Sequence, residues 1–190
     1  TVRTGVAGTT GVVTLSKDSV YMYSADKTGN ITNYTNLRSM GDENYGIYAD
    51  GTVVNNANIN FGTGIGNVGV YSILGGTATN NSTITVGDSN AQGNLYSLGM
   101  AAGYARTDSG NIINNGTINV NGEYSIGMYG SGNGTTINNY GTINLNANNT
   151  TGVYLTDKAV GRNYGTITNT AGVNNVTAIV VKNGAKFINE

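Results

Sequence analysis

The stretch from Asn114 to Gly130 reads NNGTINVNGEYSIGMYG, and a closely similar phrase, NNYGTINLNANNTTGVYL, runs from Asn138 to Leu155. Each copy contains an asparagine, a small or polar pair and an aliphatic residue, and later a glycine followed by an aliphatic residue and tyrosine. Short alternating segments that return about every 25 residues are typical of a solenoid, in which each repeat buries its apolar side only against its neighbours. The phrase therefore predicts a stack of coils.

One asparagine of the phrase recurs along the whole chain, with gaps of 22, 25, 34, 25, 24 and 26 residues. The column consists of Asn33, Asn55, Asn80, Asn114, Asn139, Asn163 and Asn189. A row of amides could hold a ligand, but stacked side-chain amides also hydrogen-bond along the axis, and asparagine accepts the backbone of a turn. We interpret the column as a structural ladder that sets the register between coils.

Alternating apolar residues predict which side of each coil faces the core, because alternate side chains of a strand share one face. After the asparagine phrase, the expected inward pairs are Ile59 with Phe61, Ile84 with Val86, Ile118 with Val120 and Ile143 with Leu145. On the glycine-containing segment, they are Tyr45 with Ile47, Val68 with Val70, Leu98 with Met100 and Ile126 with Met128. A third inward column consists of Ile31, Val53, Ala78, Ile112, Ile137 and Phe187.

Three inward columns separated by turns predict an all-β fold, a three-faced parallel β-helix of about seven coils of roughly 25 residues. The composition agrees, since 30 Gly, no Pro and only 10% charged residues suit strands and tight turns. No shift in composition marks a boundary, so residues 1–190 are expected to form a single β-helix segment. Both ends fall inside the pattern, which suggests a piece of a longer chain whose unpaired end coils favour end-to-end self-association.

Charge and hydropathy argue against several kinds of partner. The formal net charge of -1, without a run of Lys or Arg, disfavours nucleic acid. No apolar stretch is long enough to cross a bilayer, so direct membrane insertion of this segment is not expected. The chain has no His, and its 10 acidic residues recur at no coil position. We therefore predict no catalytic residues, no metal site and no cofactor.

The outer face of the glycine-containing strand is predicted to carry a tyrosine ladder, two residues after each glycine. The column consists of Tyr48, Tyr71, Tyr129 and Tyr154, with Tyr23 at one end and Ala101 as a gap. Coils stack about 4.8 Å apart, so the rings should lie next to one another. Tyrosine is enriched where partners bind, but a ladder also packs across strands, and both interpretations stay open.

The longest repeat, residues 80–114, inserts several residues beyond the usual coil. Residues 87–96 and 103–110 are expected to project as loops at the side where Ala101 interrupts the ladder. These loops carry Asp88, Tyr96, Tyr104, Arg106 and Asp108. Long loops on a rigid scaffold often carry function, although an insertion can also simply be tolerated.

The two quoted phrases resemble the passenger repeats of the large type V autotransporter adhesins of fusobacteria, and the resemblance covers nearly the whole chain. It implies a right-handed parallel β-helix displayed on the bacterial cell surface, extracellular, and held by a C-terminal barrel outside this chain. Such proteins attach to host cells and other bacteria through glycan or protein receptors. The resemblance lies in the repeat pattern, so it assigns no individual binding residue.

Three functions follow as hypotheses. The first is a non-enzymatic adhesin segment that acts as a stalk or contacts a receptor. The alternative is a carbohydrate-active β-helix enzyme, a lyase or hydrolase, which would require an acidic and basic cluster on one face. The third is an ice-binding solenoid, suggested by outward pairs such as Thr117 with Asn119 and Thr142 with Asn144. Variable coil lengths speak against the third, and the adhesin is favoured.

Overall fold

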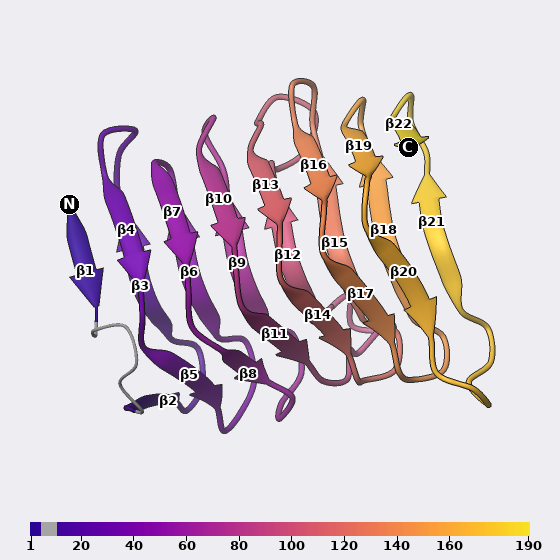
Figure 1. Ribbon diagram of the computed structural model, residues 1–190, viewed down its shortest axis with the longest axis horizontal. Helices are drawn as coiled ribbons and strands as arrows, with labels where there is room; N and C mark the ends of the chain where they lie inside the picture. The colour runs from indigo at the N-terminus through magenta and orange to yellow at the C-terminus, as the bar shows by residue number, and fades with distance from the viewer. Residues whose placement is uncertain (5–10) are drawn as a thin grey trace.

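The computed structural model describes residues 1–4 and 11–190, which wind into a stack of coils along one axis (Figure 1). In this described part, the regular elements are all β-strands, and no helix occurs. The chain forms a parallel β-solenoid of about 7 turns of about 25 residues, with three sheets. The predicted all-β, three-faced parallel β-helix is therefore confirmed.

Successive strands of each coil belong to three parallel sheets, which we name A, B and C. Sheet A consists of β1 (Val2–Thr4), β4 (Asn30–Asn33), β7 (Thr52–Asn55), β10 (Thr77–Asn80), β13 (Asn111–Asn114), β16 (Thr136–Asn139), β19 (Val160–Asn163) and β22 (Lys186–Asn189). Sheet B consists of β2 (Val12–Leu15), β5 (Asn36–Ser39), β8 (Ile59–Phe61), β11 (Thr83–Val86), β14 (Thr117–Val120), β17 (Thr142–Leu145) and β20 (Thr166–Asn169). Sheet C consists of β3 (Val20–Ser24), β6 (Tyr45–Ala49), β9 (Val68–Ser72), β12 (Leu98–Ala102), β15 (Ile126–Ser131), β18 (Thr151–Thr156) and β21 (Thr177–Val181).

The register between coils follows the apolar columns of sheets A and B. In sheet B, Ile84 pairs with Ile59 on one side and with Ile118 on the other, and all three are fully buried. In sheet A, Ala78 occupies the same position relative to Val53 and Ile112. Burying each such aliphatic side chain is worth about 1.5 to 3 kcal/mol, so the stacked columns supply most of the drive for folding.

The asparagine column forms a continuous chain of side-chain hydrogen bonds at the end of sheet A. Each Nδ2 donates to the Oδ1 of the corresponding asparagine in the next coil, over distances from 2.8 to 3.0 Å. The same Nδ2 also donates to a carbonyl two residues onward, as from Asn80 to Ser82 O at 2.7 Å. Each amide thus closes the turn from sheet A to sheet B and connects one coil to the next.

The glycine-containing strands of sheet C depart from simple alternation, and this corrects a prediction. Tyr45, Val68, Leu98 and Ile126 were expected to face the core together with the residue two positions onward. Instead, these four side chains line a groove on the outer surface, and none belongs to the buried core cluster. Their inward-facing partners, such as Val70 and Met100, do belong to that cluster.

The reason for this departure lies in the glycines, which do not face solvent as the alternation predicts. A Cβ on Gly69 would lie 2.5 Å from the carbonyl oxygen of Gly99 and 2.8 Å from Cγ2 of Ile84. The position therefore faces the next coil and the core. The residue pairing passes over it, joining Val68 to Leu98 and Val70 to Met100. As at a β-bulge, the extra residue turns the side chain before it outward.

The asparagine ladder generates a stability prediction. Asn114 is fully buried, accepts from Asn80 and donates to Asn139, with both distances 2.9 Å. Asn114→Leu should lower the free energy of unfolding by about 3 kcal/mol, because neighbouring polar groups lose their partners while remaining buried. Urea denaturation followed by circular dichroism measures this. The control is Asn115→Leu, which removes an exposed side-chain hydrogen bond to Asn81 and should lower the free energy of unfolding by less than about 1 kcal/mol. Equal effects of the two substitutions would contradict the role of the ladder.

The glycine column generates a second stability prediction. A Cβ on Gly127 would lie 2.7 Å from the carbonyl oxygen of Gly152 and 2.8 Å from Cγ2 of Ile143. Gly127→Ala should therefore destabilise the protein by about 1 to 3 kcal/mol, because neighbouring coils must move apart. Gly11→Ala is the control, since a Cβ there meets nothing within 4 Å. A thermal melt that shows no difference between the two variants would refute the proposed close packing.

Candidate functional site

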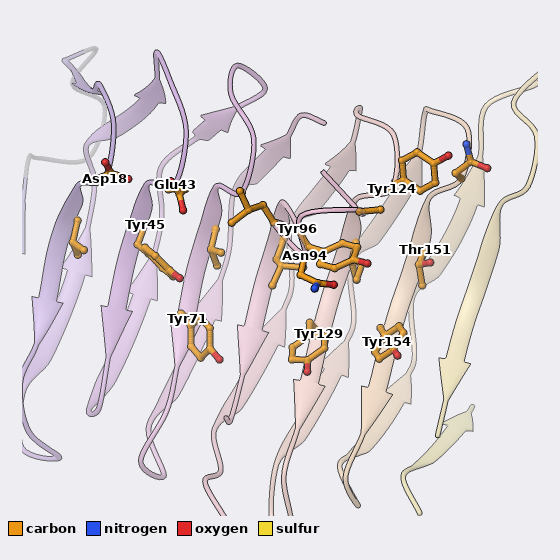
Figure 2. Close-up of a pocket in the computed structure, with 18 of the residues that line it drawn as sticks. Asp18, Glu43, Tyr45, Tyr71, Asn94, Tyr96, Tyr124, Tyr129, Thr151 and Tyr154 are labelled. Atoms are coloured by element: carbon orange, nitrogen blue, oxygen red, sulfur yellow. The ribbon is translucent and has the colours of Figure 1, made fainter. Parts of the chain in front are cut away.

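A groove of about 890 Å³ crosses the outer face of sheet C (Figure 2). Its lining includes residues of β3, β6, β9, β12, β15 and β18, from Val20 on β3 onward, and reaches Lys182, which follows β21. Six strand intervals of about 4.8 Å give it a length of about 29 Å along the axis. The groove is therefore long and narrow, and it runs across the strands.

The floor of the groove is apolar because the glycine bulges turn aliphatic side chains outward. Val68, Leu98 and Ile126 stand side by side in the register of β9, β12 and β15. Val68 and Ile126 are only 4% and 8% exposed, although they lie outside the core cluster. Other side chains of the outer face therefore cover most of Val68 and Ile126. These two residues form the packed base of the groove.

The predicted tyrosine ladder contributes one wall of the groove. Ring centroids are 5.6 Å apart between Tyr23 and Tyr48, and 5.3 Å apart between Tyr48 and Tyr71. Tyr129 and Tyr154 are stacked at 5.7 Å on the far side of Ala101. These distances exceed the strand spacing because the rings are offset and tilted, the arrangement that aromatic quadrupoles prefer.

Individual tyrosines of the ladder differ in their role. Tyr71, Tyr129 and Tyr154 line the groove, whereas Tyr48 stacks against Tyr71 without lining it. The hydroxyl of Tyr71 donates to the carbonyl oxygen of Gly103 at 2.8 Å. Burial raises the pKa of Tyr71 above its ordinary value, so this phenol keeps its proton and its hydrogen bond at physiological pH.

The first loop of the long coil, residues 87–97, contributes Asn94, Leu95 and Tyr96 to the lining of the groove, and Figure 2 shows Asn94 and Tyr96 there. Two backbone hydrogen bonds between Asn90 and Leu95, 2.8 and 3.0 Å long, close this loop. Asp88 does not face the groove, and its carboxylate instead accepts from the backbone N–H of Glu123 at 2.8 Å. The insertion is thus an ordered wall of the groove.

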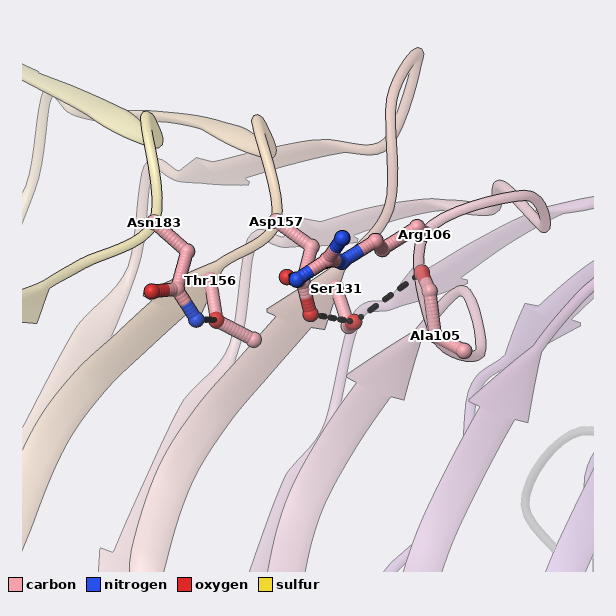
Figure 3. A network of polar contacts seen from close by, with 6 residues as sticks. All are labelled: Ala105, Arg106, Ser131, Thr156, Asp157 and Asn183. Atoms are coloured by element: carbon pink, nitrogen blue, oxygen red, sulfur yellow. Dashed lines mark hydrogen bonds and ion pairs between the residues drawn. The ribbon is translucent and has the colours of Figure 1, made fainter.

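The second loop, residues 103–110, lies at the opposite end of β12. Tyr104 there is 71% exposed, and Asp108 accepts from the backbone N–H of Leu74 at 2.8 Å. Arg106 lies 3.7 Å from Asp157 beside a smaller pocket of about 440 Å³ (Figure 3). Because the Arg106 side chain is 87% exposed, this ion pair contributes little to stability. None of these three side chains lines the tyrosine groove.

The smaller pocket contains a sparse polar network (Figure 3). Ser131 Oγ lies 3.2 Å from both the carbonyl oxygen of Ala105 and the Asp157 carboxylate. Arg106 and Lys158 are the two cationic side chains that line the smaller pocket, and Asp157 is the single carboxylate of its lining. Within residues 1–4 and 11–190, no group of three or more His, Cys, Asp or Glu side chains could hold a metal ion.

Tyr45, Tyr124 and Lys182 are among the groove residues that the sequence did not predict to lie there. The glycine after Tyr45 is the sequence signal for its outward orientation, since glycine inside a strand marks a bulge. Lys182 Nζ lies 5.3 Å from the ring centroid of Tyr154, and hydrogen bonding to Tyr154 raises the pKa of the amine. At the other end, the groove lining includes the carboxylates of Asp18 and Glu43. Charges therefore mark the two ends and leave the middle uncharged.

The fold is a parallel β-helix whose outer surface carries a groove lined by aromatic and aliphatic side chains. Residues 51–166 match the model of one family, described as the BigA third pectate lyase-like domain. The match covers more than half of the chain, and the chain belongs to this family. No curated protein and no solved structure matches it significantly. Among the residues that the structure describes, no helix is long and apolar enough to span a membrane.

Asp50 directly follows β6, and one oxygen of its buried carboxyl has no hydrogen-bond partner. The side chain is only 5% exposed, and its Oδ1 accepts no hydrogen bond, while Ser72 Oγ is likewise buried and unpaired. Burial raises the pKa of the Asp50 carboxyl, and the carboxylates of Asp108 and Asp26 raise it further. The folded state therefore favours the protonated form of Asp50.

A pH dependence follows from this raised pKa. The folded state holds the proton more tightly than the unfolded chain, so the contribution of Asp50 to stability is present below the unfolded pKa of 3.8 and is lost as pH rises. Asp50→Asn should raise the Tm at pH 7 and leave it nearly unchanged well below pH 3.8. Thermal melts across pH measure the difference. An Asp50→Asn protein that is less stable at neutral pH would show that the carboxylate is needed.

Proposed function

We propose that the chain is a surface-displayed β-helical segment of a bacterial autotransporter adhesin, located outside the cell. In this proposal, the stack acts as a scaffold, and the groove on sheet C contacts a receptor, either glycan or protein, on host cells or other bacteria. The observation that carries the proposal is the aromatic groove, about 890 Å³ in volume, on the outer face of an otherwise polar solenoid. The family's occurrence in a bacterial surface protein supports the location.

The proposed contact is non-enzymatic. Acid and base groups must reach one bond to act on it, and the groove's carboxylates and its lysine lie at opposite ends of the cleft. In the smaller pocket, Arg106 and Lys158 accompany only one carboxylate, whereas a glycosidase needs two that face one gap. The arrangement suits binding, because flat amphipathic rings offer contact area with little entropy to lose.

The groove proposal predicts which side chains control attachment. Changing Tyr48, Tyr71, Tyr129 and Tyr154 together to Ser should reduce binding of the purified segment to host or bacterial cells by tenfold or more, roughly the effect of losing 1.4 kcal/mol. The matched control changes Tyr140 and Tyr164 to Ser, because these rings stack at 4.7 Å but do not line the groove. Circular dichroism checks that both variants keep the β-helix.

Two results would contradict the proposal. Unchanged attachment of the four-tyrosine variant would remove the groove as the contact surface. Cleavage products from polysaccharides incubated with the wild-type segment would replace the binding role with the carbohydrate-active alternative. Cells and soluble polysaccharides are therefore tested with the same preparations.

A further inference from the structure

We infer that the groove on sheet C recognises an extended chain of neutral sugars that lies along the axis of the β-helix. This inference rests on the proposed binding function of the groove and names the class of its ligand. It follows from the length of the groove, from the exposed aromatic rings of its lining, from the backbone pairing of sheet C and from the distribution of the charges along the groove.

The length of the groove favours a linear ligand. The lining runs from Val20 on the first strand of sheet C to Lys182 beyond the last, about 29 Å, and remains one connected cleft of about 890 Å³. A compact ligand would occupy only a small part of such a cleft. A chain of repeating units that lies across the strands would contact every coil.

The aromatic rings of the lining favour a ligand with flat apolar faces. Tyr129 and Tyr154 are stacked on each other at 5.7 Å, so their facing surfaces are already in contact. The loop adds Tyr96 to the lining and the turn before β15 adds Tyr124, and these side chains are 37% and 45% exposed. A pyranose ring has one apolar face that can stack on an aromatic ring. Tyr96 and Tyr124 therefore offer the more open aromatic surface to a sugar unit.

The backbone of sheet C argues against an extended peptide. A peptide usually binds a β-protein by adding a strand at a free sheet edge, where main-chain groups are unpaired. The groove lies on the face of sheet C, and inner strands such as β9 and β12 already pair with a neighbour on each side. The amides of a peptide on this apolar floor would lose water without gaining backbone partners.

The polar groups at the groove match hydroxyls instead. Asn94 and Thr151 line the cleft, and the tyrosines add phenolic oxygens close to the stacking faces (Figure 2). Such side chains can donate to or accept from a sugar hydroxyl in either direction. The ligand's polar rim would then be satisfied while its apolar faces contact Leu98 and the exposed tyrosine rings of the lining.

The charge distribution selects neutral sugars over acidic ones. Asp18 and Glu43 lie at one end, and Lys182 is the single cation of the lining, at the other. Carboxylates on every sugar unit would meet two like charges at one end and an uncharged apolar floor in the middle, where they would be desolvated without a partner. A neutral chain avoids both costs.

Isothermal titration calorimetry with defined oligosaccharides tests this inference. The probes are neutral hexose oligosaccharides of increasing length and galacturonic acid oligosaccharides of the same lengths. We expect the Kd for a neutral series to fall with each added unit until the groove is filled, with at least tenfold weaker binding of the acidic series. Tyr124→Ser should weaken neutral binding by about tenfold, Tyr124→Phe should retain most of it because the ring remains, and Tyr164→Ser should not change it.

The outcomes separate the ligand class from the proposed function. Preference for the acidic series, or affinity independent of chain length, would overturn the inference. If no oligosaccharide binds while the four-tyrosine variant still loses cell attachment, the inference fails and the adhesin proposal stands with a protein receptor. If neither oligosaccharide binding nor an effect of the tyrosines on attachment is found, both fail.

Discussion

Parallel backbone pairing between successive coils is the constraint on which the rest of this structure depends. Equivalent residues of successive coils lie one strand spacing apart in the same surroundings. A residue type that fits one coil therefore also fits the next. The side chains of the asparagine column reinforce this pairing through hydrogen bonds from one coil to the next. Because each amide both closes a turn and bonds to the next coil, a slip of register would break the turn and the ladder together. A slip by one residue would also turn the apolar columns of that coil away from the core.

The same constraint explains why the groove lies on sheet C. Close stacking leaves no room for a Cβ at the glycine column, where Gly127 faces the carbonyl of Gly152. The bulge that glycine permits turns the preceding side chain outward, and pairing then lines up these outward residues from coil to coil. A packing requirement between coils thus produces a continuous apolar floor on the solvent side. Sheets A and B, whose strands alternate regularly, bury their aliphatic residues inward instead.

Much of this architecture is predictable from local patterns, and the exceptions have physical causes. The inward columns of sheets A and B follow from strict alternation, as for Ile118 and Val120. The orientation of Leu98 and Ile126 was predicted wrongly because alternation assumes a regular strand, which the following glycine disrupts. Tyr124 and Lys182 could not be assigned to the groove from sequence, since one lies in a turn with φ of 60° and the other follows the last strand of sheet C. Their positions depend on how the turns stack.

The two irregularities of the repeat, the alanine in the tyrosine column and the long coil, are parts of one change. Ala101 occupies a ladder position between Tyr71 and Tyr129, yet its side chain is completely buried. The same coil sends its inserted loop back over sheet C and brings Tyr96 into the groove. A tyrosine at position 101 would compete for space with the side chains that now cover this site. The coil therefore lacks a ring at the ladder position and adds Tyr96 to the groove lining, and the family match over residues 51–166 includes that coil. The regular solenoid surface thereby gains one local irregularity, in the coil between β9 and β15.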